Sequence, residues 1–148
     1  MRLTKLAHAG VKLVKDGATL VIDPGTFSSG TQALAEADAV LITHEHADHL
    51  DAGALRNALE ARPGLQVRAS TAVADQLGSF GGRVQPVRHG DTFTTAGFRV
   101  HVHGQEHARS HQEIPVVPNI GFLVDGELFR PGDALTVPDE HVPTLIDL

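Results

Sequence analysis

The residue types best suited to chemistry are concentrated in one short run, His44-Glu45-His46-Ala47-Asp48-His49. Imidazoles and carboxylates bind Zn²⁺, Mn²⁺ or Fe, and the chain has no cysteine that could supply a thiolate instead. A loop with this spacing can turn His44 and His46 toward one ion, and Asp48 and His49 toward a second. The run therefore predicts a site for one or two divalent metal ions, zinc first and manganese or iron as alternatives. The other interpretation is a solvated polar loop.

Two positions elsewhere in the chain could complete this site. His107 lies beyond a strand predicted at 98–103, and Asp133 lies beyond a strand predicted at 128–130. Sites in sheet proteins gather just past strand ends, which is where both residues are expected. A Gly-Asp pair is by itself a common turn, so Asp133 gains its weight only from this context.

The elements that must position these residues follow from short apolar and β-branched runs between turn residues. Strands predicted at 3–6, 11–15 and 19–22 form a meander, with a hairpin turn at Asp16-Gly17. After a weak helical segment at 32–36, the continuous apolar run 39–42 predicts a strand buried on both faces. That strand leads directly into the histidine-rich run.

In the rest of the chain, predicted helices and strands alternate first, and predicted hairpins follow. Helices predicted at 54–61 and 72–77 alternate with strands at 65–69 and 84–87, which indicates a parallel or mixed sheet. Strands at 92–95, 98–103, 120–124 and 128–130 follow, and residues 142–148 would be a strand entering a second sheet. The pattern predicts one α/β domain, residues 1–148, with no linker.

Composition narrows the classes of partner. The chain of 148 residues has 12 Lys and Arg against 18 Asp and Glu, a formal charge of −6. It lacks the basic field that binds nucleic acid or an anionic membrane. No apolar run reaches membrane-spanning length, and the N-terminus has no signal-peptide pattern. We expect a cytoplasmic protein with a small-molecule substrate.

The run 43–50 resembles the signature His-x-His-x-Asp-His of the metallo-β-lactamase fold superfamily. The order of features agrees, because the meander ends in Leu20-Val21-Ile22-Asp23-Pro24-Gly25, where that superfamily has a strand ending in Asp. The similarity covers essentially the whole chain and is greatest to small metal-dependent hydrolases near the ascorbate-phosphate lactonases. It implies an αββα sandwich. The motif is specific for fold and metal, and poorly specific for substrate.

The resemblance also implies roles for single residues. One metal would be held by His44, His46 and His107, the second by Asp48 and His49, with Asp133 bridging the two. A metal-bound hydroxide would attack a small ester, lactone or phosphate-type substrate, and Asp48 would orient it or take up a proton. Asp23 has two interpretations: a carboxylate that holds a ligand imidazole through its other ring nitrogen, or a turn cap.

The remaining histidines carry less chemistry. His111, in the loop 108–118, is a candidate for substrate contact or proton transfer, and with Asp48 it completes the predicted catalytic pair. His101 and His103 alternate with valines and share one strand face; they could serve a metal, but a half-buried sheet face is the favoured interpretation. His89 is expected at the surface.

The sequence departs from the family pattern at its C-terminal end. The superfamily supplies a further His to the second metal well beyond the bridging Asp, whereas this sequence ends 15 residues after Asp133, at Leu148. The usual C-terminal third is missing. Three consequences stay open: a mononuclear site, completion by another chain or by a spare His such as His111 or His141, or a non-catalytic remnant. Self-association would cover the exposed edge, which predicts a homodimer.

These observations favour a metal-dependent hydrolase. The main alternative is a protein that keeps the fold and a metal but has no turnover. A nuclease or phosphodiesterase of the same superfamily is a weaker alternative, because the chain has no basic or aromatic cluster. Structural zinc is also disfavoured, since such sites are usually closed cages rich in cysteine.

Overall fold

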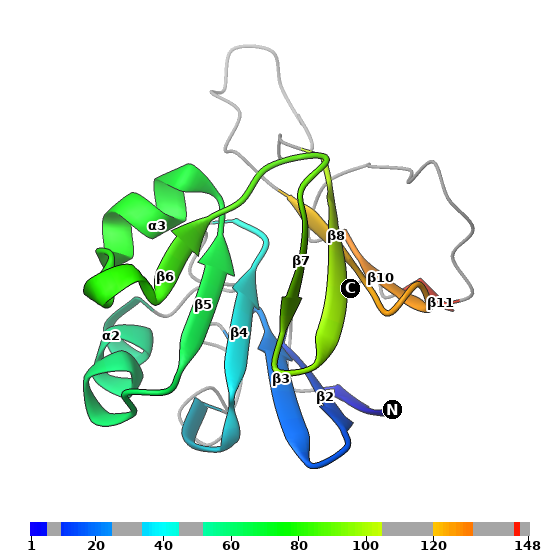
Figure 1. The fold of residues 1–148 in the computed structure, drawn as a ribbon, viewed down its shortest axis with the longest axis horizontal. Helices are drawn as coiled ribbons and strands as arrows, with labels where there is room; N and C mark the ends of the chain where they lie inside the picture. The colour runs from blue at the N-terminus through cyan, green and yellow to red at the C-terminus, as the bar shows by residue number, and fades with distance from the viewer. Residues whose placement is uncertain (6–9, 25–33, 45–51, 105–119, 132–143, 146–148) are drawn as a thin grey trace.

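The computed structural model describes residues 1–5, 10–24, 34–44, 52–104, 120–131 and 144–145. Two β-sheets pack face to face, and helices cover the outer face of the first sheet (Figure 1). The predicted mixed α/β fold with two sheets is confirmed. No helix among the described residues is long and apolar enough to cross a membrane.

The first sheet has six strands in the order β1-β2-β3-β4-β5-β6. They are β1 Arg2–Lys5, β2 Val11–Lys15, β3 Ala18–Ile22, β4 Ala39–Ile42, β5 Gln66–Ala69 and β6 Val84–Pro86. The first three are antiparallel, and β3 through β6 run parallel. The turn between β2 and β3 has positive φ at Asp16 and Gly17, 52° and 79°, as a two-residue hairpin requires.

Strand β4 is buried on both faces, as its continuous apolar sequence predicts. Val40 and Ile42 pack with the helices, whereas Ala39 and Leu41 belong to the core between the two sheets. Its alternate side chains thus contribute to two separate apolar layers. This burial fixes β4 firmly in the centre of the sheet.

Two helices pack on the first sheet, α2 Ala52–Ala61 and α3 Thr71–Leu77, and residues 34–36 are helical as well. Helix α2 buries Leu55 and Leu59, the pair that predicted it. The Ser70 side chain caps α3 by accepting from the Val73 backbone N–H at 3.4 Å. The short 3₁₀ helix Phe80–Gly82 was not predicted, because its two glycines are typical of a turn.

The second sheet has the order β11-β10-β9-β8-β7. Its strands are β7 Thr92–Thr95, β8 Phe98–His103, β9 Gly121–Val124, β10 Leu128–Arg130 and β11 Thr144–Leu145. Neighbours pair antiparallel except β11, which runs parallel to β10. The strand predicted near the C-terminus therefore does enter the second sheet. An αββα sandwich also has helices over this sheet; α2 and α3 both lie on the first.

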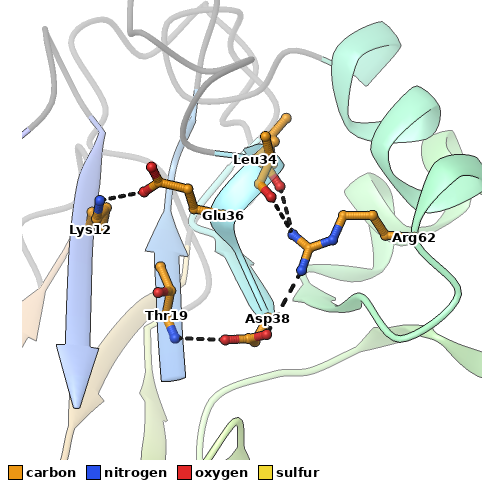
Figure 2. Close-up of polar contacts among 7 residues, drawn as sticks. Lys12, Thr19, Leu34, Glu36, Asp38 and Arg62 are labelled. Carbon is orange, nitrogen blue, oxygen red and sulfur yellow. Dashed lines mark hydrogen bonds and ion pairs between the residues drawn. The ribbon is translucent and has the colours of Figure 1, made fainter. Parts of the chain in front are cut away.

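The segment that leads into β4 is held by polar contacts on both sides (Figure 2). The Arg62 guanidinium donates to the carbonyls of Leu34 and Ala35, at 3.0 and 3.1 Å, and lies 3.8 Å from the Asp38 carboxylate. Asp38 in turn accepts from the Thr19 backbone N–H at 2.9 Å, and its own N–H donates to the Thr19 carbonyl. These contacts fix the register at which β4 enters the sheet beside β3.

Candidate metal centre

Four buried polar side chains meet where the two sheets come together. Asp23 directly follows β3, and Thr43 and His44 directly follow β4, so parallel pairing brings all three to the same edge of the first sheet. Arg130 reaches them from the end of β10 in the second sheet. All four residues are 0% exposed. Burial of polar groups is costly unless they are hydrogen-bonded or paired, and these side chains contact one another.

Asp23 holds the end of β4 through both of its carboxylate oxygens. Oδ1 accepts from the Thr43 backbone N–H at 2.7 Å, and Oδ2 accepts from the Thr43 hydroxyl at 2.7 Å. Its own N–H donates to the Leu41 carbonyl at 2.9 Å, and its φ of 55° lies in the left-handed region that aspartate tolerates. The carboxylate therefore acts on a residue 20 positions away, which is not the geometry of a turn cap.

The Thr43 hydroxyl connects this carboxylate to the imidazole of His44. Its Oγ1 lies 3.0 Å from His44 Nδ1. Asp23 thus reaches a predicted metal ligand through an intervening hydroxyl. A hydrogen bond to one ring nitrogen orients the imidazole and leaves the other nitrogen as the one suited to a cation.

Arg130 supplies the positive charge of the cluster. Its terminal nitrogen lies 3.5 Å from Asp23 Oδ2, and both side chains are 0% exposed. Close by, the Ile120 backbone N–H donates to the Thr43 carbonyl at 2.8 Å, a second link between the sheets. A buried arginine needs a counter-charge. The pair therefore ties the second sheet to the edge of the first where His44 lies.

Sequence reasoning missed Arg130, although a signal was present. Side chains alternate along a strand, so Arg130 shares a face with Leu128, and Leu128 packs in the core between the sheets. A charged residue on the core face of a short apolar strand is unusual. That position indicates a buried partner, which the structure identifies as Asp23.

Of the predicted metal and catalytic residues, the structure describes His44. The others lie outside the described residues: His46, Asp48, His49, His107, His111 and Asp133. The strand ends that precede them do converge. His103 at the end of β8 pairs with Gly121, next to Ile120, which bonds to Thr43. Arg130 at the end of β10 reaches Asp23. The ends of β4, β8 and β10 thus meet at one edge.

The histidines of the second sheet lie on its outer face. His103 is 4% exposed, and its ring centroid is 4.3 Å from that of His101 and 5.8 Å from that of Phe129. His101 is half-buried, as expected, and lines a hollow of about 440 Å³ with Thr92, Arg99, Leu123, Asp125 and Gly126. His89 is exposed, also as expected, and its Nδ1 accepts from the Gly104 N–H at 2.9 Å. His103 is more buried than the sequence indicated.

Of the residues at this edge, His44 fits one ligand position of a metal centre. Within the part of the chain that the structure describes, no three His, Cys, Asp or Glu side chains form a group that could hold an ion. His44, however, has the environment of a metal-ligating histidine: buried, and held at one ring nitrogen by a group that a carboxylate positions. A metal at this edge is consistent with these residues and needs further ligands from the segments that follow the strand ends.

The chain is similar to known proteins along almost its whole length. The family model described as "Beta-lactamase superfamily domain" matches residues 2–146. Protein Rv0786c of Mycobacterium tuberculosis is 40% identical over 151 residues, which cover 98% of this chain and 69% of that protein. A UPF0173 metal-dependent hydrolase of Methanoculleus marisnigri is 36% identical over 99 residues, or 67% of this chain and 40% of that protein.

Solved structures agree with this assignment. A protein from Parabacteroides distasonis, described as a metal-dependent hydrolase, superposes with a TM-score of 0.71 at 25% identity. The match covers 89% of this chain, and the chain spans 60% of the length of that structure. Because the family model covers nearly every residue and the chain superposes on this neighbour over 89% of its length, the chain belongs to the beta-lactamase superfamily and has the metallo-β-lactamase fold.

Proposed function

We propose that this protein is a metal-dependent hydrolase that acts on a small ester, lactone or phosphate-type substrate. The observation that carries the proposal is the buried His44, positioned by Thr43 and Asp23 at the edge where three strand ends meet. Relatives named as metal-dependent hydrolases support the same activity. The net charge of −6 argues for a small substrate rather than a polynucleotide.

The residues proposed to hold the metal lie in the stretches of sequence that follow β4, β8 and β10. One divalent cation would be held by His44, His46 and His107 and a second by Asp48 and His49, with Asp133 shared by the two. Zinc is the first candidate, and manganese or iron are the alternatives. When bound, the cation supplies Lewis acidity and lowers the pKa of water to near neutrality. Asp48 would orient the attacking water or take up a proton, and His111 would contact the substrate or transfer a proton.

The oligomeric state is part of the same proposal. Strand β1 forms an edge of the first sheet, and its four residues, including the apolar Leu3, are all exposed. Exposed strand edges favour pairing with another chain. We propose a cytoplasmic homodimer. Analytical ultracentrifugation should give twice the chain mass, and a monomer at micromolar concentration would contradict it.

The activity is tested with chromogenic esters, lactones and phosphodiesters, assayed with and without a chelator. We expect hydrolysis of at least one class, its loss on chelation, and its return on addition of Zn²⁺ or Mn²⁺. His44→Gln should abolish this activity. The matched control is His101→Gln, which removes an imidazole from the outer face of the second sheet and should leave activity unchanged. Hydrolysis that survives chelation, or His44→Gln at full activity, would contradict the proposal.

A further inference from the structure

The Thr43 hydroxyl lies between the Asp23 carboxylate and the His44 imidazole, and it has only one proton. Oγ1 lies 2.7 Å from Asp23 Oδ2 and 3.0 Å from His44 Nδ1. The proton can serve one of these contacts, and the lone pairs of the oxygen must serve the other. The direction of the two hydrogen bonds therefore determines which ring nitrogen of His44 carries hydrogen.

The Asp23 carboxylate determines the direction of these two hydrogen bonds. Asp23 faces the guanidinium of Arg130, and a carboxylate in an ion pair only accepts hydrogen bonds. The Thr43 backbone N–H also donates to it, at Oδ1. The hydroxyl proton is thus directed to Oδ2. The remaining contact at His44 requires that Nδ1 carry hydrogen and donate to Oγ1.

The geometry points to a positioning role for Thr43: we propose that it holds His44 as the Nδ1–H tautomer, with Asp23 and Arg130 fixing the direction of its hydroxyl. The lone pair of the imidazole is then on Nε2, the form in which a neutral imidazole binds a cation. The tautomer is a property of the metal-free protein; only the use of Nε2 as a ligand rests on the proposed function.

A purely structural role for Thr43 would give a different result. Valine keeps the shape of threonine and its backbone N–H, but removes the acceptor that Nδ1–H needs. Serine keeps the hydroxyl. If Thr43 only fills space, Thr43→Val should leave the imidazole unchanged. If it sets the tautomer, Thr43→Val should shift His44 toward the Nε2–H form, and Thr43→Ser should restore the wild-type form.

The test uses ¹⁵N-labelled protein stripped of metal, at a pH of about 8.5, where ordinary imidazoles are neutral. Long-range ¹H–¹⁵N spectra report the tautomer, and the His44 signals are those lost in His44→Gln. We expect Nδ1–H in the wild type and in Thr43→Ser, and a mixed or Nε2–H form in Thr43→Val. A wild-type spectrum with Nε2–H overturns the proposal by itself, even if the valine variant does not fold.

Zinc affinity, measured by competition with a chromogenic chelator, separates this inference from the proposed function. Loss of the oriented ring should weaken zinc binding by about 10- to 100-fold in Thr43→Val, and Thr43→Ser should bind like the wild type. Wild-type protein with the Nδ1–H form but no zinc binding would overturn the proposed function and support the inference. Tight zinc binding with an unchanged tautomer in Thr43→Val would overturn the inference alone.

Discussion

An aspartate pairs with an arginine at each end of β4, and the two pairs differ in their solvent exposure. Where β4 begins, Asp38 and Arg62 lie 3.8 Å apart, with side chains 47% and 35% exposed. Where it ends, Asp23 and Arg130 lie 3.5 Å apart, and both are 0% exposed. In each pair the carboxylate also accepts a backbone N–H from a neighbouring segment, that of Thr19 or Thr43.

The difference in exposure suits the two ion pairs to different roles, one in folding and one in the proposed metal site. An exposed ion pair contributes little because water competes with it, so Asp38 and Arg62 chiefly set strand register. A buried pair has a large desolvation cost, and apolar residues of similar volume would often be at least as stable. Asp23 reaches His44 through the Thr43 hydroxyl, so under the proposed function this cost is offset by the orientation of the imidazole.

The largest expected effect is on stability when one buried partner is removed. Arg130→Met leaves the Asp23 carboxylate buried without its counter-charge, which should lower the free energy of unfolding by about 3–5 kcal/mol. The matched change at the other end, Arg62→Met, should cost only about 1 kcal/mol. Urea denaturation measures both. Equal losses of stability in the two variants would mean that the buried and the exposed ion pair contribute equally, which would contradict this prediction.

The next effect concerns the hydroxyl between the carboxylate and the imidazole. Thr43→Val removes the donor to Asp23 Oδ2 and should lower the free energy of unfolding by about 1–3 kcal/mol, the cost of an unsatisfied buried group. Thr43→Ser keeps the donor and should lower the free energy of unfolding by less. The same denaturation experiment decides, and a valine variant as stable as the serine variant would count against a hydrogen bond at this position.

A smaller effect on stability is expected at the start of β4, where Asp38 is exposed, and this effect should depend on salt. Asp38→Asn should lower the free energy of unfolding by no more than about 1 kcal/mol, and salt should reduce that difference because exposed charges are screened. The loss in Arg130→Met should barely change with salt, since buried pairs are screened much less. Denaturation at low and at high NaCl tests both statements. A salt-sensitive loss in Arg130→Met would show that its pair is open to solvent.

The smallest effect is on the pH dependence of stability, through Glu36 near the start of β4. Lys12 lowers the pKa of Glu36 below its ordinary value of 4.5, through a side-chain hydrogen bond first and charge attraction second. A carboxyl group whose pKa is lowered on folding stabilises the protein above its ordinary pKa, and this contribution is lost as the pH falls through the folded value. The stability difference between wild type and Glu36→Gln should therefore shrink below a pH of about 4.5. A difference that stays constant there would argue against this ion pair.

Much of the fold follows from local patterns. The apolar run of β4, the alternation in β8 and the Asp-Gly turns predict strands within a residue or two of their observed bounds. The histidine run predicts where a metal would bind, and the structure places its first member, His44, at the buried edge. These features are local, so one segment of sequence is enough to recognise them.

The partners of His44 are not set by local sequence patterns, because they depend on how the sheets pack. Arg130 meets Asp23 only when β10 of the second sheet lies against the end of β3. The role of Thr43 depends on a hydrogen bond to a residue 20 positions earlier. The sequence left Asp23 between two interpretations for the same reason. Its contacts with Thr43 favour the one in which it acts on a ligand imidazole.

The most direct test of the central claim is the metal content per chain of protein purified without added metal or chelator, with the intact mass checked on the same sample. We expect one or two ions per chain in the wild type and in His101→Gln, and a clear loss in His44→Gln. A wild-type value near zero, or His44→Gln with the full wild-type content, would contradict a metal centre built on His44.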